Sequence, residues 1–238
     1  MIVAKNLSVI YPDCVYALDG VSFNIAEGEH VAIVGANGAG KSTLLLAMVG
    51  IVRLSSGELR VGDIELSDKN LPLIREKLGL LFQNPDDQLF MPTIYDDVAF
   101  GLQNRKVDAH EVSERVNSTL ETLNIAHLSA KQPMRLSGGE KRIAALATII
   151  AMEPQLLLMD EPSSYLDPAA RETLIALLKG LPHAQLIATH DLDLALDVCS
   201  RVLVLTHGKL AIMGDAQEIL TDKKMLESCG LRLPLSIR

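Results

Sequence analysis

Residues 30–49 read HVAIVGANGAGKSTLLLAMV, and this stretch decides the fold. The apolar run at 30–34 predicts a buried strand, and 41–49 predicts a helix that ends at Gly50. Between them, the pattern GxxxxGK[ST] lets consecutive backbone N–H groups curl around phosphate groups, while the helix N-terminus adds its positive dipole end. We expect Lys41 to reach the β- and γ-phosphates of a nucleotide and the Ser42 hydroxyl to ligate Mg²⁺. The predicted phosphate-binding loop comprises Gly35, Ala36, Asn37, Gly38, Ala39, Gly40, Lys41, Ser42 and Thr43.

A second motif supplies the groups that nucleotide hydrolysis requires. Residues 156–161 read LLLMDE, an apolar strand that ends in two acids. We expect Asp160 to hold Mg²⁺ through water, and Glu161, one residue further, to lie beside an attacking water. The alternative is a strand capped by two solvated acids, and the phosphate-binding loop together with Pro162 disfavours it.

The arrangement of apolar segments predicts an α/β architecture. Val21, Phe23 and Ile25 alternate with polar neighbours, which indicates a half-buried antiparallel strand. Residues 155–160, 185–190 and 201–205 read as buried strands that alternate with helices, so most of the core sheet should be parallel. The helix after Asp167 has an aspartate cap, a proline at its first position and Gly180 just past its end.

The middle of the chain has a different pattern. Val112, Val116, Leu120 and Leu123 are spaced four, four and three residues apart, as on one face of an amphipathic helix. We therefore predict a helical subdomain over approximately 84–153, set into a single domain that spans 1–238.

Composition excludes several classes of protein. The 238 residues are 48% apolar, which is too much for a disordered chain. The apolar stretch at 143–152, which Thr148 interrupts, is short of the roughly 18–20 residues that span a bilayer, and the N-terminus does not resemble a signal peptide. We expect a cytosolic chain. The formal charge of -8 argues against a nucleic-acid partner, and Cys14, Cys199 and Cys229 fit reduced, mostly buried thiols.

A third motif, LSGGE, lies at a predicted helix start, so it offers a second anion-binding end. Its residues are Leu136, Ser137, Gly138, Gly139 and Glu140. Ser137 lies 23 residues before Asp160, and this combination of three motifs resembles the ATPase subunits of ATP-binding cassette transporters. The resemblance implies a P-loop NTPase with a mostly parallel core sheet, an antiparallel β subdomain and a helical subdomain. It also implies a Mg²⁺-dependent ATPase whose cofactors are ATP and Mg²⁺.

The resemblance assigns roles to further residues. Tyr11 stands where the family places an aromatic that stacks on adenine. Gln83 follows a predicted strand at 78–82 (LGLLF) and matches the glutamine that touches Mg²⁺ and the attacking water. His190 matches the histidine that contacts the γ-phosphate. Ser164 and Asp167 match the loop that follows the catalytic acid. Tyr165 departs from the small residue common at its position in that loop.

The resemblance also implies partners. Two subunits of this kind bind head to tail, each site pairing the phosphate-binding loop of one copy with Ser137 of the other. We expect a homodimer, because every motif is intact. We also expect separate membrane scaffold and substrate-binding subunits, which would place the chain at the cytoplasmic face of the cell membrane.

The segment FQNPDDQLF at 82–90, extended by Thr93 and 96–101, is similar to the ATPases of energy-coupling-factor transporters, which import transition-metal ions and vitamins. Cobalt or nickel is favoured as cargo, because vitamin-serving members commonly have a longer C-terminal extension and this chain stops at Arg238. A vitamin importer such as one for biotin remains an alternative, as does a cytosolic ATPase of the same family without transport. A non-hydrolysing nucleotide-binding module is the least favoured reading, because Glu161 is present.

Overall fold

The computed structural model describes residues 1–12 and 16–237, which form two compact units. Unit 1 comprises Met1–Leu80, Gln155–Glu161 and Pro182–Arg238. Unit 2 comprises Leu81–Pro154 and Pro162–Leu181. Cys14 lies outside the described residues, while Cys199 and Cys229 are free and buried.

Unit 1 contains an antiparallel four-stranded sheet with the order β2-β1-β4-β5. The side chains of Val21, Phe23 and Ile25 point into the core and alternate with exposed residues, as the sequence predicts. The strands are β1 (Ile2–Ile10), β2 (Tyr16–Ile25), β4 (Ser56–Val61) and β5 (Ile64–Glu65).

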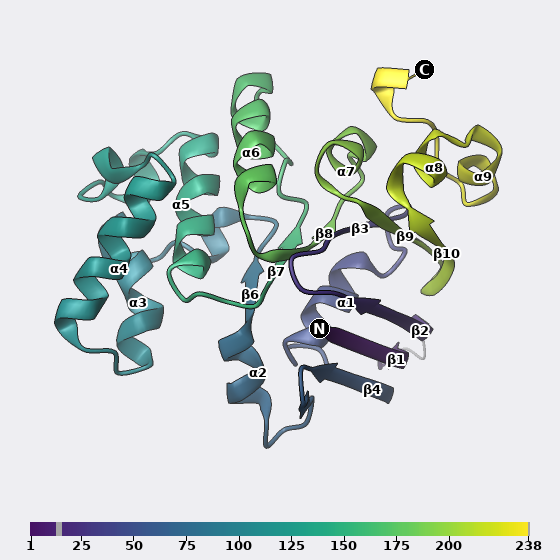
Figure 1. Ribbon diagram of the computed structural model, residues 1–238, viewed down its shortest axis with the longest axis horizontal. Helices are drawn as coiled ribbons and strands as arrows, with labels where there is room; N and C mark the ends of the chain where they lie inside the picture. Colours follow the sequence, from purple (N-terminus) through teal and green to yellow (C-terminus); the bar gives the residue numbers. More distant parts are fainter. Residues whose placement is uncertain (13–15, 238) are drawn as a thin grey trace. The chain divides into compact units, whose positions relative to one another are not determined.

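A second, six-stranded sheet has the order β10-β9-β3-β8-β7-β6 (Figure 1). β3 pairs in parallel with both β8 and β9, and β7 pairs in parallel with β8, whereas β10 is antiparallel to β9. The mostly parallel core sheet predicted from sequence is therefore confirmed. The strands are β3 (His30–Val34), β6 (Leu78–Leu81), β7 (Leu156–Asp160), β8 (Ala184–Ala188), β9 (Arg201–Thr206) and β10 (Lys209–Asp215).

Five helices belong to unit 1, among the residues that the structure describes. Helix α1 packs against β2 on one side and against β7 and β8 on the other, so a single hydrophobic core joins the two sheets. The helices are α1 (Lys41–Met48), α2 (Leu71–Lys77), α7 (Leu192–Val198), α8 (Ala216–Thr221) and α9 (Lys223–Ser228), followed by the 3-10 turn η4 (Leu235–Ile237).

Unit 2 is helical. Helix α3 packs against α4 and α5, and α6 packs against α5 (Figure 1). The predicted stripe on α4 is buried, with Val112, Val116, Leu120 and the C-cap residue Leu123 in the core. The elements are η1 (Pro85–Asp87), α3 (Ile94–Asn104), α4 (Ala109–Thr122), η2 (Ala126–Leu128), η3 (Pro133–Arg135), α5 (Gly138–Ile150) and α6 (Pro168–Gly180).

Several element boundaries differ by one or two residues from the sequence prediction. β8 ends at Ala188 rather than at His190, because the Thr189 hydroxyl accepts the N–H of Asp191 and turns the chain into α7. Gly180 is the last residue of α6 and not the first residue beyond it. The strand before Gln83 ends at Leu81, since side chains bind the backbone of Phe82.

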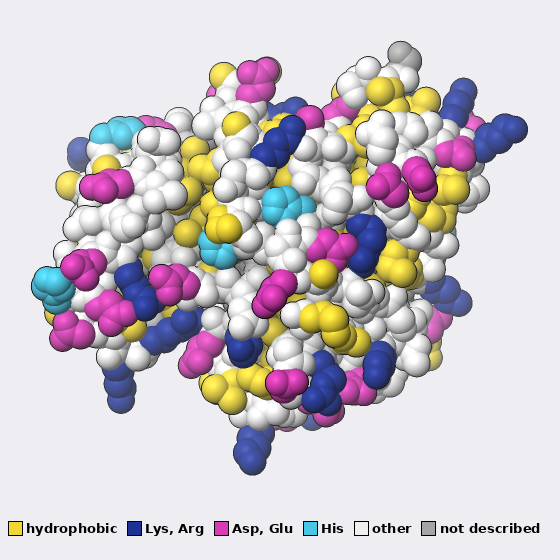
Figure 2. Space-filling view, in the orientation of Figure 1, with side chains coloured by type: hydrophobic (Ala, Val, Ile, Leu, Met, Phe, Trp, Pro, Cys, Tyr) yellow, Lys and Arg dark blue, Asp and Glu magenta, His cyan; other side chains and the backbone are white. Residues whose placement is uncertain are grey.

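Two further features concern the surface charges and the apolar character of the helices. On the face shown in Figure 2, acidic and basic side chains are interspersed. Within the described ranges, no helix combines the length and the apolar character needed to cross a bilayer.

Unit 2 contains a buried carboxylate that shapes the chain before α3. Asp97 is 4% exposed, and its Oδ1 accepts the backbone N–H groups of Phe90 and Met91 at 2.9 and 3.0 Å. Its Oδ2 has no hydrogen-bond partner among the residues that the structure describes. Burial raises the pKa of this carboxyl, against the lowering effect of the two N–H donors.

Asp97→Asn should become more stable relative to the wild type as pH rises. The pKa of the Asp97 carboxyl is higher in the folded state than in the unfolded state. The wild type therefore loses stability as the pH rises from the unfolded-state pKa through the folded-state pKa. Asparagine does not titrate, so the variant does not lose this stability. Differential scanning calorimetry at several pH values between about 4 and 7 measures the difference in Tm. The surface variant Asp63→Asn is the control. A Tm difference that is constant over this range would contradict the prediction.

Candidate functional site

The loop between β3 and α1 requires glycine at both ends. A β-carbon on Gly35 would lie 2.4 Å from the carbonyl oxygen of Leu205. Gly40 has φ of +103°, and a β-carbon there would lie 2.4 Å from the carbonyl oxygen of Ala17. The chain can therefore pass close to β2 and β9 before α1 begins. The first-turn N–H groups of α1 are left available for an anion at this helix start.

Lys41 places a positive charge inside this loop. Its side chain is 7% exposed, and Nζ donates to the carbonyl oxygens of Gly35 at 2.9 Å and Ala36 at 3.3 Å. A buried ammonium needs such acceptors, because an unpaired charge is costly to desolvate. Together, the cation and the helix start suit a polyphosphate.

An aromatic side chain lies beside the same loop. The Tyr11 hydroxyl and Thr43 Oγ1 are 3.3 Å apart, within hydrogen-bonding distance. Thr43 belongs to the first turn of α1, so this contact ties the predicted base-stacking residue to the predicted phosphate-binding loop. The Tyr11 side chain is partly exposed, which leaves ring surface available for a ligand.

The acid that follows β7 is held by its neighbours. Glu161 is 7% exposed, and its Oε2 lies 2.7 Å from His190 Nδ1. The same oxygen accepts the backbone N–H of His190 and the hydroxyl of Thr189, both at 3.2 Å. The carboxylate thus has a fixed direction. Glu161 has φ of +47°, an uncommon conformation for a residue with a side chain.

The donors available to a divalent cation in unit 1 are oxygens. The Ser42 hydroxyl lies in the first turn of α1, and the Asp160 carboxylate ends β7. Mg²⁺ prefers carboxylate, hydroxyl and phosphate oxygens, so this donor set fits the ion that the fold implies. Gln83, the third predicted ligand, belongs to unit 2 and has an exposed side chain.

The LSGGE motif in unit 2 forms a capping box at the start of α5. Ser137 Oγ accepts the N–H of Glu140 at 3.3 Å, and Glu140 Oε2 accepts the N–H of Ser137 at 2.8 Å. That second bond is the main cause of the lowered pKa of Glu140. Gly139 leaves no room for a side chain, because a β-carbon would lie 2.8 Å from Cβ of Ala170 on α6.

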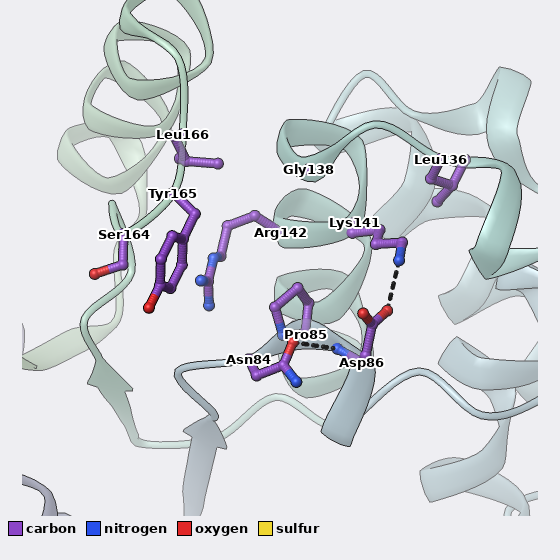
Figure 3. Close-up of a pocket in the computed structure, with 10 residues that line it drawn as sticks. All are labelled: Asn84, Pro85, Asp86, Leu136, Gly138, Lys141, Arg142, Ser164, Tyr165 and Leu166. Atoms are coloured by element: carbon purple, nitrogen blue, oxygen red, sulfur yellow. Dashed lines mark hydrogen bonds and ion pairs between the residues drawn. The ribbon is translucent and has the colours of Figure 1, made fainter.

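The loop before α6 borders a pocket of about 270 Å³ in unit 2 (Figure 3). Asp167 caps α6 by accepting the N–H of Ala170 at 2.9 Å. Ser164 lines the pocket beside Tyr165, whose side chain is 90% exposed and whose φ is +64°. The lining residues are Asn84, Pro85, Asp86, Leu136, Gly138, Lys141, Arg142, Ser164, Tyr165 and Leu166.

The predicted site residues therefore fall into two sets. Unit 1 contains Tyr11, the loop at 35–43, Asp160, Glu161 and His190, while unit 2 holds Gln83, residues 136–140, Ser164 and Asp167. Within unit 1, hydrogen-bonding contacts join Tyr11 to Thr43 and Glu161 to His190. Two further polar residues contact members of these sets although no sequence motif marks them.

Those two residues are Thr189 and Arg142. Thr189 is the buried hydroxyl that donates to Glu161. Arg142 binds the carbonyl oxygen of Gln83. Neither stands at a position that a spacing pattern marks, although Thr189 directly precedes the predicted His190.

Comparison with known proteins agrees with this geometry. Residues 18–164 match the ABC transporter family. The chain is 44% identical over 237 residues to the energy-coupling factor transporter ATP-binding protein EcfA of Carboxydothermus hydrogenoformans, covering 98% of this chain and 87% of the relative.

Two solved structures are similar over nearly the whole chain. The first is CbiO1 from Clostridium perfringens, described as part of the ABC transporter complex CbiONQ; it is 37% identical with a TM-score of 0.85, covering 98% of this chain and 95% of the other. The second is a dimeric ATP-binding cassette in a post-hydrolysis state with ADP and phosphate, 29% identical with a TM-score of 0.80, covering 91% and 99%. The chain is an ATPase that belongs to the ABC transporter family.

Proposed function

We propose that this ATPase energises a membrane importer of the energy-coupling-factor type, for cobalt or nickel ions. The observation that carries the proposal is similarity along 98% of the chain both to an EcfA protein and to CbiO1 of a CbiONQ complex. The segment at 82–90 supports the same class. Membrane scaffold and substrate-binding subunits would be separate chains, and this chain would bind them from the cytoplasmic side.

We assign binding of the ATP phosphates to the loop at 35–43. Lys41 Nζ and the N–H groups at the start of α1 supply positive charge and donors to the β- and γ-phosphates. Tyr11, fixed by Thr43, would stack on the adenine. Ser42, Asp160 and Gln83 would hold Mg²⁺, which when bound neutralises negative charge on the phosphates.

We assign the proton transfer to Glu161. Water attacks the γ-phosphorus, its proton passes to the Glu161 carboxylate, and the bond to the leaving ADP breaks. The bonds from Thr189 and His190 to Oε2 fix the direction of this base. His190 has a side chain that is largely exposed, so it is available to stabilise charge on the γ-phosphate while it orients Glu161.

A second copy of the chain would complete each site. The dimeric relative supports a dimer of this chain. In the head-to-tail arrangement that the family resemblance implies, Ser137, Gly138 and Gly139 of one copy would face the nucleotide held by the other. Ser164 and Asp167 would lie in the loop that contacts the partner. Because the chain has a net charge of -8, nucleotide-mediated contacts would be needed to offset repulsion between copies.

Glu161→Gln should abolish turnover and trap an ATP-bound dimer. The amide can still accept hydrogen bonds but cannot take a proton, so hydrolysis should fall by about 10²–10⁴-fold while ATP affinity is retained. Phosphate release and size-exclusion chromatography with and without ATP measure the two effects. Lys41→Ala is the control that should lose ATP binding. Undiminished turnover would place the base elsewhere, and a monomer at saturating ATP would contradict the homodimer.

Thr189→Val should reduce catalysis with little effect on binding. Valine has the shape of threonine without the hydroxyl, so Glu161 loses one donor, and kcat should fall about tenfold, as for one hydrogen bond to a charged group. The ATP KM should change little. Thr189→Ser restores the hydroxyl and should restore most of kcat. Equal losses in both variants would instead attribute the effect to packing.

Deletion of the gene in its host should abolish cobalt or nickel uptake. Uptake of labelled cobalt, nickel and biotin is measured in the deletion strain, and again after complementation with the wild type or with Glu161→Gln. Only the wild type should restore transport, since hydrolysis drives it. Loss of biotin uptake with unchanged metal uptake would support the vitamin alternative. No change in any of the three would support an ATPase without transport.

A further inference from the structure

The chain beyond β6 is held by side chains at its polar backbone groups. The N–H of Phe82 donates to Gln88 Oε1 at 3.3 Å, and its carbonyl oxygen accepts from Arg142 Nη1 at 2.8 Å. The carbonyl oxygen of Gln83 accepts from Arg142 Nη2 at 2.7 Å. Backbone groups that leave a sheet need new partners, and here two side chains supply them.

Both of these side chains are anchored on α5. Arg142 belongs to that helix, and Gln88 Nε2 donates to the Ala145 carbonyl oxygen at 2.8 Å and to Thr148 Oγ1 at 2.7 Å. Lys141 adds an ion pair with Asp86 at 2.6 Å (Figure 3). The contacts come from successive turns of one face of α5. The segment at 82–88 is therefore fastened to the helix that the LSGGE motif begins.

Another side chain would not reproduce the contact of Arg142 with the two carbonyl oxygens of Phe82 and Gln83. Its guanidinium is always charged and the residue is only 1% exposed, so it must be paired. The planar fork reaches two consecutive carbonyl oxygens at once, whereas a lysine ammonium acts as a point charge on a flexible stem. In Figure 3 the guanidinium lies between the ring of Tyr165 and the residues Asn84 and Pro85.

We propose that Arg142 is a positioning residue for Gln83. By holding the carbonyl oxygens of Phe82 and Gln83, it sets the direction in which the Gln83 side chain leaves the backbone. It also makes this segment move together with α5, so Gln83 and the LSGGE motif keep one spacing within unit 2. The inference rests on the proposed function, in which Gln83 contacts Mg²⁺ and the attacking water.

The test combines Arg142→Lys and Gln83→Ala, singly and together, in the full chain. Arg142→Lys should lower kcat about tenfold and change the ATP KM by less than about threefold, since misplacing a catalytic group affects the reaction more than binding. In the Gln83→Ala background the same change should have an effect of less than about twofold, because its target is already gone. Arg105→Lys is the matched control. It alters another arginine–carbonyl bond of unit 2, to Met152, and should leave kcat within about twofold of the wild type.

Hydrogen exchange of the nucleotide-free protein gives a readout that is independent of activity. Peptides covering 82–88 should exchange faster in Arg142→Lys, while peptides covering α4 should be unchanged. If Arg142→Lys does not fold, Gln88→Leu removes the other side chain that holds Phe82. Gln88→Leu should show the same faster exchange and the same loss of effect in the Gln83→Ala background.

Three results would overturn the inference. The kcat of the double variant could fall by the product of the two single effects. That result would show that Arg142 acts independently of Gln83, and it would leave the proposed function intact. Unchanged hydrogen exchange of residues 82–88 in Arg142→Lys would show that Arg142 does not hold this segment. Wild-type turnover in Gln83→Ala would remove both the inference and the role proposed for Gln83.

Discussion

Two backbone hydrogen bonds organise the candidate site of unit 1. The N–H of Glu161 donates to the carbonyl oxygen of Ala188 at 2.8 Å, which extends the parallel ladder between β7 and β8 one residue past the strand end. The N–H of Thr189 donates likewise to Ile33 on β3 at 2.9 Å. Parallel strands end at the same edge of a sheet, so these two bonds place the acid, the hydroxyl and the phosphate-binding loop at one edge.

The hydrogen bond between Glu161 and Ala188 also explains the unfavourable backbone conformation of Glu161. At Glu161 the φ of +47° costs about 1–2 kcal/mol for a residue with a side chain. The ladder bond to Ala188 and the bonds from Thr189 and His190 to Oε2 hold the residue there. Strain of this kind persists only where the surroundings over-determine it. A relaxed conformation would turn the carboxylate away from its two neighbours.

The fold class follows from sequence because its signals are local. The strand at His30–Val34 and the stripe on α4 are read from continuous or periodic apolar residues, and both are confirmed. Helices α8 and α9 were not predicted: each has six residues, fewer than two full turns, so no period can be recognised. For the site, the acids at the end of a strand marked Glu161 and the family resemblance marked His190, and the contact between these two residues is seen in the structure. Thr189 and Arg142 act through partners 28 and 59 residues away, which no local pattern encodes.

Both units use one physical device where a strand ends. A chain that leaves a sheet exposes N–H and C=O groups that must find new acceptors and donors. After β8 the hydroxyl of Thr189 meets this need for Asp191 and at the same time orients Glu161. After β6, Gln88 and Arg142 meet it for Phe82 and Gln83. Because the satisfying side chains are buried or half-buried, a residue proposed to touch the nucleotide can have an exposed side chain and still a fixed backbone. The side chain of Gln83 is therefore accessible to a ligand, while its backbone is held in one position.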